Sequence, residues 1–147
     1  MNIGYISGFF DGEGTLNISN NRWRISIPQT HYRVLDEIRK FVGFGSIYKT
    51  KKKKEHHKDA WVYTITNSKD VLEFLIMIEP FLIVKKEFIN EQIFILKNKE
   101  INDIIKINER VNQKNKVIEL KESGLSYRKI EKIMGFSRQK VSRLLNE

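Results

Sequence analysis

The sequence predicts an α+β fold, in which a four-stranded antiparallel sheet is covered by helices on one face and is followed by a small all-α domain. The first observation behind this is the order of hydrophobic patterns over residues 1–100: helix, hairpin, helix, hairpin, helices. The second is the alternation of apolar and polar side chains in both hairpins, which is typical of strands buried on one face only. The third is a series of short amphipathic helical patterns in residues 113–147. We therefore expect an apolar sheet face under helices and an open, polar and basic face.

The first predicted helix contains residues 6–14, Ile-Ser-Gly-Phe-Phe-Asp-Gly-Glu-Gly. Gly8 and Gly12 are four residues apart, so they share a helix face and let another backbone approach closely along it. Gly14 suits the left-handed residue that ends a helix. Glu13 would then be exposed at the negative end of the helix dipole, where a cation best satisfies a carboxylate.

The alternation of apolar and polar residues predicts two β-hairpins. Residues 15–19 and 22–27 alternate on either side of Asn20-Asn21, a pair that suits a two-residue turn. Residues 45–50 and 61–66 predict a second hairpin, whose connecting loop is a basic run. Both hairpins place polar side chains rich in hydrogen-bond donors on the face opposite the apolar one.

Helices are expected between and after the hairpins. A stripe of apolar residues predicts a helix over residues 32–42, which ends at Gly43. Ser68 is a good N-cap for a helix over residues 69–78, and after a proline a long helical pattern begins near Val84.

Composition favours a polyanionic partner. The chain has 147 residues, and Lys and Arg number 27 against 18 Asp and Glu, a net charge of +9. Nucleic acid is the first expectation and an anionic membrane surface the second. Neither a transmembrane run nor a signal-peptide pattern is found in the sequence, so we expect an intracellular protein. Because the chain has no cysteine and three histidines, two of them adjacent in the lysine run, we expect any metal to be bound by oxygen.

Residues 6–14 resemble the LAGLIDADG motif of homing endonucleases, with Ile6, Gly8, Asp11, Glu13 and Gly14 at the defining positions. The resemblance covers about residues 3–100 and implies a sheet that forms a saddle in the DNA major groove. It also implies that the motif helix packs on its twin and that the last acidic residue, Glu13, binds the catalytic metal. Glutamate departs from the commoner aspartate at that position.

The same resemblance assigns two further active-site residues. Gln29 matches the polar residue that helps position water or metal in many members, and Lys85 matches the basic residue near the scissile phosphate. We expect hydrolysis of a phosphodiester bond, with Glu13, Gln29 and Lys85 as the catalytic residues.

A single motif implies a homodimer, because one Glu13 per chain supplies too few ligands for cleavage of two strands. Packing across a two-fold axis would place Gly8, Gly12, Phe9 and Asp11 in the interface and two Glu13 carboxylates side by side. Like charges so close need a metal between them, for which we expect Mg²⁺, with Mn²⁺ as a substitute. The expected substrate is a long, near-palindromic site in double-stranded DNA.

DNA contacts are expected from the open sheet face and from the basic loop. Arginine is the commonest specific reader of guanine, whereas lysines of a loop grip phosphates. The sheet-face residues are Asn17, Ser19, Arg22, Arg24, Ser26, Ser46, Tyr48 and Thr64, and the loop lysines are Lys51, Lys52, Lys53 and Lys54.

The end of the chain predicts a second DNA-binding domain. Residues 97–116 are polar and indicate a partly helical connector, placed at 101–112 between domains over 1–100 and 113–147. The last domain resembles the helix-turn-helix of resolvase and invertase DNA-binding domains: a helix from Val117, a second capped by Ser126 and a third, the recognition helix. Its expected DNA contacts are Arg138, Gln139, Lys140, Ser142 and Arg143.

Several alternatives stay open at this level. The motif would also suit a buried helix followed by a turn, and the last domain a helical bundle that makes protein contacts. A non-catalytic DNA-binding regulator and an intron RNA maturase would use the same scaffold, which makes RNA a less favoured partner than DNA.

Overall fold

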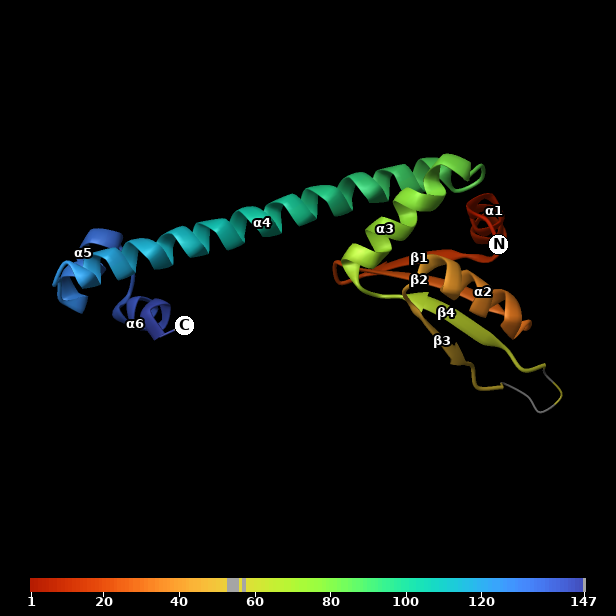
Figure 1. Cartoon of the computed structure of the whole chain (residues 1–147), viewed down its shortest axis with the longest axis horizontal. Coiled ribbons are helices and arrows are strands. Elements are labelled where there is room, and N and C mark those ends of the chain that lie inside the picture. Colours follow the sequence, from red (N-terminus) through yellow and green to blue (C-terminus); the bar gives the residue numbers. More distant parts are fainter. Residues whose placement is uncertain (53–55, 57, 147) are drawn as a thin grey trace. The chain divides into compact units, whose positions relative to one another are not determined.

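The computed structural model describes residues 1–52, 56 and 58–146 (Figure 1). Its contacts divide the chain into two compact units, Met1–Lys97 and Asn98–Glu147. The domain boundaries expected from the sequence, 1–100, 101–112 and 113–147, stay a prediction. In the part of the chain that the structure describes, we find no helix both long and apolar enough to cross a membrane.

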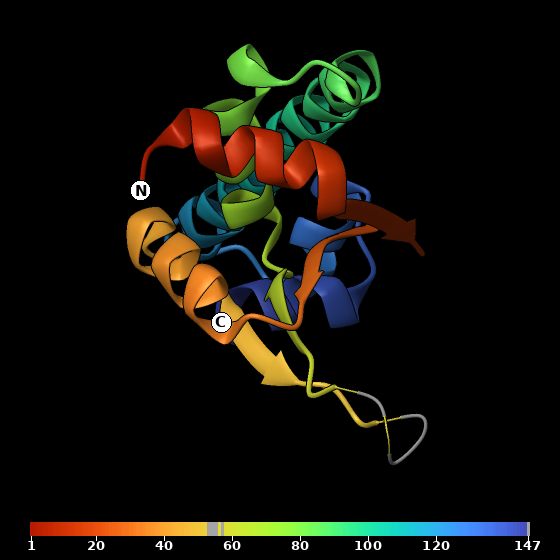
Figure 2. The same ribbon diagram turned by 90° about the vertical axis from the view of Figure 1, so that its right-hand side faces the viewer.

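The first unit has the predicted α+β architecture (Figures 1 and 2). Its four strands form one sheet in the order β1-β2-β4-β3, with every neighbouring pair antiparallel. In Figure 2, the helices α1 and α2 lie on the same side of these strands. The elements are α1 (Ile3–Glu13), β1 (Thr15–Ser19), β2 (Arg22–Gln29), α2 (Tyr32–Val42), β3 (Ser46–Lys49), β4 (Trp61–Ile65), α3 (Ser68–Ile78), the 3-10 helix η1 (Glu79–Phe81) and the first part of α4 (Lys86–Glu122).

Strand register separates the two sheet faces as the alternation predicts. Asn20 and Asn21 both have positive φ, 49° and 59°, which is the two-residue hairpin turn whose twist matches that of the strands. The helix-covered face is apolar and, with helices α1 to α4, forms the core of the unit. Its fully or nearly fully buried strand residues are Trp23, Ile25, Ile27, Tyr63 and Ile65.

The junction between α1 and β1 consists of Gly14 alone. The left-handed conformation expected there is wrong, because Gly14 has φ −78° and ψ 150°, an extended conformation open to any residue. Glycine is needed for a different reason: a Cβ at this position would lie 2.2 Å from the Phe10 ring. Phe10 is fully buried and meets Phe74 of α3 edge to face at 5.7 Å, so the ring has no room to move.

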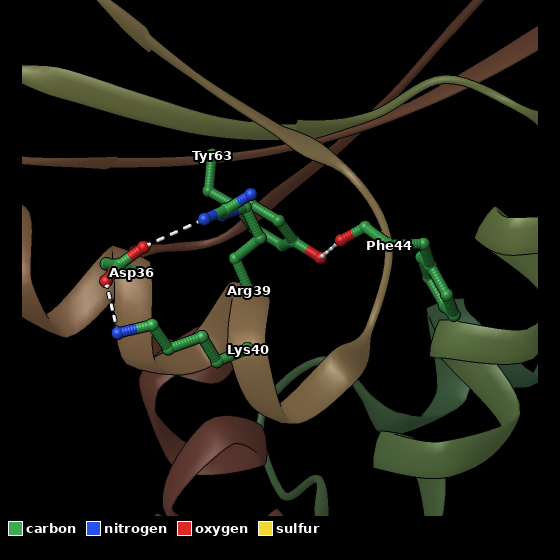
Figure 3. A network of polar contacts seen from close by, with 5 residues as sticks. All are labelled: Asp36, Arg39, Lys40, Phe44 and Tyr63. Atoms are coloured by element: carbon green, nitrogen blue, oxygen red, sulfur yellow. Dashed lines mark hydrogen bonds and ion pairs between the residues drawn. The ribbon is translucent and has the colours of Figure 1, made fainter.

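The connection from α2 to β3 is held by the buried Tyr63. Its hydroxyl donates a hydrogen bond of 2.8 Å to the Phe44 carbonyl, and burial raises the pKa of this phenol (Figure 3). Gly43 and Gly45 flank Phe44 with φ of 89° and 86°. A Cβ at Gly45 would lie 2.6 Å from the Tyr63 ring, so both backbone conformation and space require glycine there.

The solvent-facing side of α2 carries a small ion-pair network. Asp36 pairs with Lys40 at 2.8 Å and with Arg39 at 3.1 Å (Figure 3). The Lys40 and Arg39 side chains hold the pKa of Asp36 below its usual value. These pairs are exposed and contribute little to stability.

Helix boundaries differ from the expected ones where capping side chains decide them. The first helix begins at Ile3 rather than Ile6, because the Asn2 side chain accepts the Tyr5 amide at 2.8 Å. Asn67, not Ser68, caps α3, with its side chain accepting the Lys69 amide at 2.9 Å.

The region from residue 97 to 116 is helical throughout, not partly helical as expected. It belongs to α4, which is continuous from Lys86 to Glu122 and includes the helix expected to begin at Val117. Residues 101–110 are all exposed. The polar composition that suggested a break reflects this exposure, since a solvated helix needs no apolar stripe.

The second unit contains the end of α4 together with α5 (Tyr127–Met134) and α6 (Arg138–Asn146). Gly135 ends α5 in the left-handed conformation, φ 66°, and two residues then lead to α6. The core consists of four buried residues, one from α4, one from α5 and two from α6: Val117, Ile130, Val141 and Leu144. Of the two isoleucines of α5 that the sequence led us to expect in this core, Ile130 is buried, but Ile133 is 58% exposed, so that expectation is wrong for Ile133. The resemblance to a helix-turn-helix stays a prediction.

We predict that Gly14→Ala lowers the free energy of unfolding of the first unit by about 1–3 kcal/mol, the usual cost of overpacking a core. Gly4→Ala is the matched control, because a Cβ at Gly4 makes only an ordinary contact of 3.6 Å with Asn2. Alanine is also the better helix former there by about 1 kcal/mol. Urea unfolding of both variants at low protein concentration measures the difference, and equal stabilities would contradict the close packing over Phe10.

Candidate active site and nucleic-acid interface

The candidate metal ligand, Glu13, is the last residue of α1. Its side chain is exposed, and among the described residues its carboxylate has neither a hydrogen bond nor an ion pair. Because the following glycine enters the sheet directly, the carboxylate is held where the helix layer meets the first strand. Its oxygens are therefore open to a ligand.

The candidate basic residue, Lys85, lies against the same end of α1. Its ammonium donates a hydrogen bond of 3.0 Å to the Phe10 carbonyl and a shorter one to the Asp11 carbonyl. The Nζ atom also lies 5.6 Å from the centre of the Phe10 ring. The Lys85 ammonium therefore binds the last turn of α1, the turn that ends with Glu13. The roles of Glu13 and Lys85 in an active site stay a prediction.

Asp11 has an intrachain role that the sequence analysis missed. One carboxylate oxygen accepts the backbone amides of Ile83 at 2.7 Å and Val84 at 3.1 Å, and the other accepts the amide of Lys85 at 3.0 Å. Partial burial opposes ionisation, but the amides of Ile83, Lys85 and Val84 and the Lys85 charge together lower the pKa of Asp11. The signal was present, since a carboxylate in the last turn of a helix is disfavoured by the dipole unless it has a partner.

Gln29 is the last residue of β2, on the strand face that the helices cover. Its side-chain oxygen accepts the Thr30 amide at 2.8 Å. Since Thr15 pairs with Ser26, Gln29 and Glu13 lie at the same end of the β1–β2 pair, away from the hairpin turn. Among the described residues, no hydrogen bond joins Gln29 to Glu13 or to Lys85.

The open face of the sheet carries the predicted DNA-contacting residues together. Cross-strand partners in an antiparallel sheet share a face. The pairs Asn17–Arg24, Ser19–Arg22, Ser26–Thr64 and Ser46–Thr64 therefore belong to one face, with Tyr48 opposite Val62 on it. Seven of the eight are exposed or half-buried, and Thr64 is buried.

A hollow of about 1020 Å³ lies at the hairpin end of β1 and β2. Four of the predicted DNA-contacting residues line this hollow, and two of them are arginines. The residues lining it are Asn17, Ser19, Asn20, Arg22, Trp23, Arg24, Thr66 and Ser68. It is polar and basic in character, which suits phosphate and base edges.

The basic loop is described only in part. Lys51 and Lys52 are exposed, and Lys52 pairs with Asp59 at 3.1 Å, an acid that also pairs with Lys49 at 2.9 Å. Lys49 and Lys52 hold the pKa of Asp59 below its usual value. Lys53 and Lys54, also expected to contact DNA, lie outside the described residues.

The outer face of α1 is open. A Cβ at Gly8 or at Gly12 would meet no atom of the described residues within 4 Å. Large apolar side chains are exposed on α1 and on the segment bound to it. Tyr5 is 49% exposed and stacks on Phe9, and Ile83 and Val84, whose amides bind Asp11, are 87% and 81% exposed. Exposed aromatic and branched side chains of this kind are typical of a surface that another molecule covers.

The predicted recognition helix, α6, presents its polar side chains in different ways. Arg138 and Gln139 are exposed. Lys140 is half-buried, with its ammonium 3.6 Å from the centre of the Phe136 ring. Ser142 accepts a hydrogen bond of 3.4 Å from Asn146, and Arg143 is exposed but already engaged in an interaction.

A metal site within one chain is not complete. The described residues contain no group of three His, Cys, Asp or Glu side chains that could hold a metal ion. Glu13 offers carboxylate oxygens, the ligand type that Mg²⁺ prefers, but one carboxylate leaves most ligand positions to a second chain, substrate or water.

Comparison with protein families shows to which family the chain belongs. The model of the LAGLIDADG-like domain matches residues 1–79, more than half of the chain. The chain belongs to the LAGLIDADG family. No curated protein matches the sequence.

Solved LAGLIDADG structures share the fold. The homing endonuclease I-CvuI in complex with its target is 19% identical, with a TM-score of 0.52 over 65% of this chain and 65% of that one. I-CvuI on the I-CreI target in the presence of Mg, with uncleaved DNA, is 17% identical, with a TM-score of 0.50 and the same coverage. The LAGLIDADG meganuclease I-AabMI bound to uncleaved DNA is 21% identical, with a TM-score of 0.54 over 74% of this chain and 42% of that one. This chain thus spans less than two thirds of each of these proteins, and at such identities the likeness shows the fold alone.

Proposed function

We propose that this LAGLIDADG protein is a homodimeric, divalent-metal-dependent endonuclease that cleaves both strands of a long, near-palindromic DNA site. The observation that carries the proposal is the last turn of α1. It ends with Glu13, an exposed carboxylate without a partner among the described residues, and its Phe10 and Asp11 carbonyls bind the Lys85 ammonium. A metal ligand and a cation at one helix turn are what phosphodiester hydrolysis requires, because negative charge builds on the phosphoryl and leaving oxygens.

Each residue would then have a separate task. Bound divalent metal would stabilise charge on the attacking and leaving oxygens. Glu13 would hold it through carboxylate oxygens, Lys85 would stabilise charge at the cut phosphate, and Gln29 would orient water. Mg²⁺ is the expected ion and Mn²⁺ a substitute, and the structures of I-CvuI obtained with Ca and with Mg support the use of a divalent ion.

The homodimer is supported by the open face of α1. Gly8 and Gly12 leave space for a second backbone. Apolar side chains lie on the same helix, at Phe9, and on the segment bound to it, at Ile83 and Val84. A two-fold axis along this face would bring two Glu13 carboxylates together, which supplies the ligands that one chain lacks. Phe9 and Asp11 are proposed at the edge of this interface.

The open sheet face would read the DNA sequence. Arg22 and Arg24 line the basic hollow and suit guanine edges in the major groove. Lys51 would grip phosphate, a contact that raises affinity without setting sequence. The second unit would add a helix-turn-helix, with Arg138 and Gln139 directed to base edges or phosphates.

Removal of the metal ligand tests the chemistry. We predict that Glu13→Gln abolishes cleavage in Mg²⁺ and in Mn²⁺ and changes DNA affinity by less than about tenfold, because shape and the remote DNA contacts are kept. Glu73→Gln, an exposed carboxylate of α3, is the control and should cleave like the parent. A library of DNA sites supplies the substrate, and rates are measured with each ion and with chelator.

Two results would count against the assignment. Cleavage by Glu13→Gln at near the parent rate would remove Glu13 as the ligand. A parent chain that binds DNA but does not cut it with either ion would instead be a regulator on this scaffold, and RNA binding with intron splicing would make it a maturase.

The dimer is tested by filling the glycine face. We predict that Gly8→Leu gives monomers that neither bind the full site nor cut it, since a leucine would separate the two helix backbones. Glu73→Leu places the same side chain on α3 and should leave the protein dimeric. Sedimentation measures the state, and a dimeric Gly8→Leu would remove the interface assignment.

The helix-turn-helix is tested on the surface of α6. We predict that Arg138→Ala combined with Gln139→Ala weakens DNA binding at least about tenfold, since each base contact contributes about 1–3 kcal/mol. Cleavage at saturating protein should be kept. Lys106→Ala, in the exposed part of α4, is the control for loss of one positive charge. An unchanged affinity and footprint in the double variant would favour a bundle that makes protein contacts.

A further inference from the structure

Two helix ends of opposite polarity are tied to each other by two residues of opposite charge. The carboxyl end of α1 has its Phe10 and Asp11 carbonyls bound by the Lys85 ammonium. The Asp11 carboxylate binds the amides of residues 83–85, which immediately precede the amino end of α4. We call these two sets of hydrogen bonds the Asp11–Lys85 clamp.

Each residue of the clamp has the charge that suits the helix end to which it binds. A helix carries partial negative charge at its carboxyl end and partial positive charge at its amino end, so a cation suits the first and an anion the second. Asp11 by itself stands at the wrong end of its own helix, in the last turn of α1. Its interaction with the start of α4 turns an unfavourable position into a favourable one.

Both oxygens of Asp11 are in use. Oδ2 accepts the amides of Ile83 and Val84, and Oδ1 accepts the amide of Lys85. Three amides converging on one carboxylate fix the backbone of residues 83–85, including the residue that carries the cation. Lys85 is only half-buried and its side chain has four rotatable bonds, so without this backbone anchor its ammonium would have a wide range of positions.

We infer that Asp11 is a positioning residue for the reaction, because it fixes the backbone of residues 83–85 and thereby holds the Lys85 ammonium at the last turn of α1, which ends with Glu13. The inference rests on the proposed nuclease function and adds to it a residue that acts only through another. It also gives Asp11 a task within its own chain, distinct from the place in the dimer interface expected from the motif.

Asp11→Asn is the informative substitution because it keeps size and shape. An amide has one acceptor oxygen, so either the Lys85 amide or the amides of Ile83 and Val84 must face an NH₂ group and lose their acceptor. We expect the single-turnover cleavage rate at saturating Mg²⁺ to fall by about 10- to 100-fold, the usual effect of a small misplacement of a reacting group. DNA affinity and the dimer should be kept, as they should in the control Asp36→Asn, whose carboxylate makes ion pairs on α2.

A double-mutant cycle separates positioning from general damage to the fold. In a Lys85→Met background the side chain to be placed is already missing, so Asp11→Asn should change the residual cleavage rate by less than about threefold. If Asp11→Asn lowers the cleavage rate by the same factor in the parent and in the Lys85→Met background, Asp11 acts independently of Lys85, and the inference is overturned. Dissociation of Asp11→Asn into monomers would also overturn it, in favour of the interface role.

A measurement on the free protein keeps the inference testable without cleavage. Hydrogen exchange of the amides of residues 83–85 should be slow in the parent and at least about tenfold faster in Asp11→Asn, with the α3 amides unchanged as reference. If the parent proves to bind DNA without cutting it, the proposed function fails, and exchange alone decides whether Asp11 holds this segment. Unchanged exchange at residues 83–85 overturns the inference in either case.

Discussion

The structure of the first unit depends on the close packing of Gly14 over the ring of Phe10. Because this one residue joins α1 to β1, the helix enters the sheet without a loop, and its last carboxylate lies at the boundary between the two layers. The ring beneath is held in turn by Phe74, so the junction has no freedom to shift. A side chain on residue 14 would push the helix away from the strand and move Glu13 with it.

The division of the sheet into an apolar face and a polar face follows from the packing of the helices. With helices α1, α2 and α3 packed on one face, alternate residues of β2 and β4 are in the core, and the residues between them face the open surface. The arginines of β2 then lie together with the amides and hydroxyls of β1, because antiparallel register pairs them across the hairpin. The basic surface is therefore a consequence of strand alternation, and the place of the proposed metal ligand, Glu13, is a consequence of where the first helix ends.

The residues proposed to act in catalysis lie at helix ends rather than in a deep pocket. The carboxyl end of α1 would repel a metal-binding carboxylate if its carbonyls were left bare, and Lys85 offsets that partial charge. The same lysine is the cation proposed to act on phosphate, so one side chain would serve both the fold and the reaction.

Local patterns in the sequence determined most of the architecture. The alternation in residues 15–27 gave the first hairpin and both of its faces, because strand side chains point to opposite sides with a period of two. The pair Asn20-Asn21 indicated the turn, which the positive φ values confirm. Gly8 and Gly12 indicated a helix face that another backbone can approach, and the structure leaves space for one there, although the dimer stays a proposal. Glu13 was named from the motif and Lys85 from the wider resemblance, and their roles stay predictions.

Tertiary structure decided what depends on partners distant in the chain. Asp11 binds amides that are 72 to 74 residues away, and the use of glycine at position 14 depends on the place of a ring rather than on backbone conformation. The continuity of α4 through its polar middle was likewise hidden, since an exposed helix carries no apolar periodicity to reveal it. Sequence periodicity records which side of an element is buried, whereas hydrogen bonds and close contacts between elements exist only once the chain has folded.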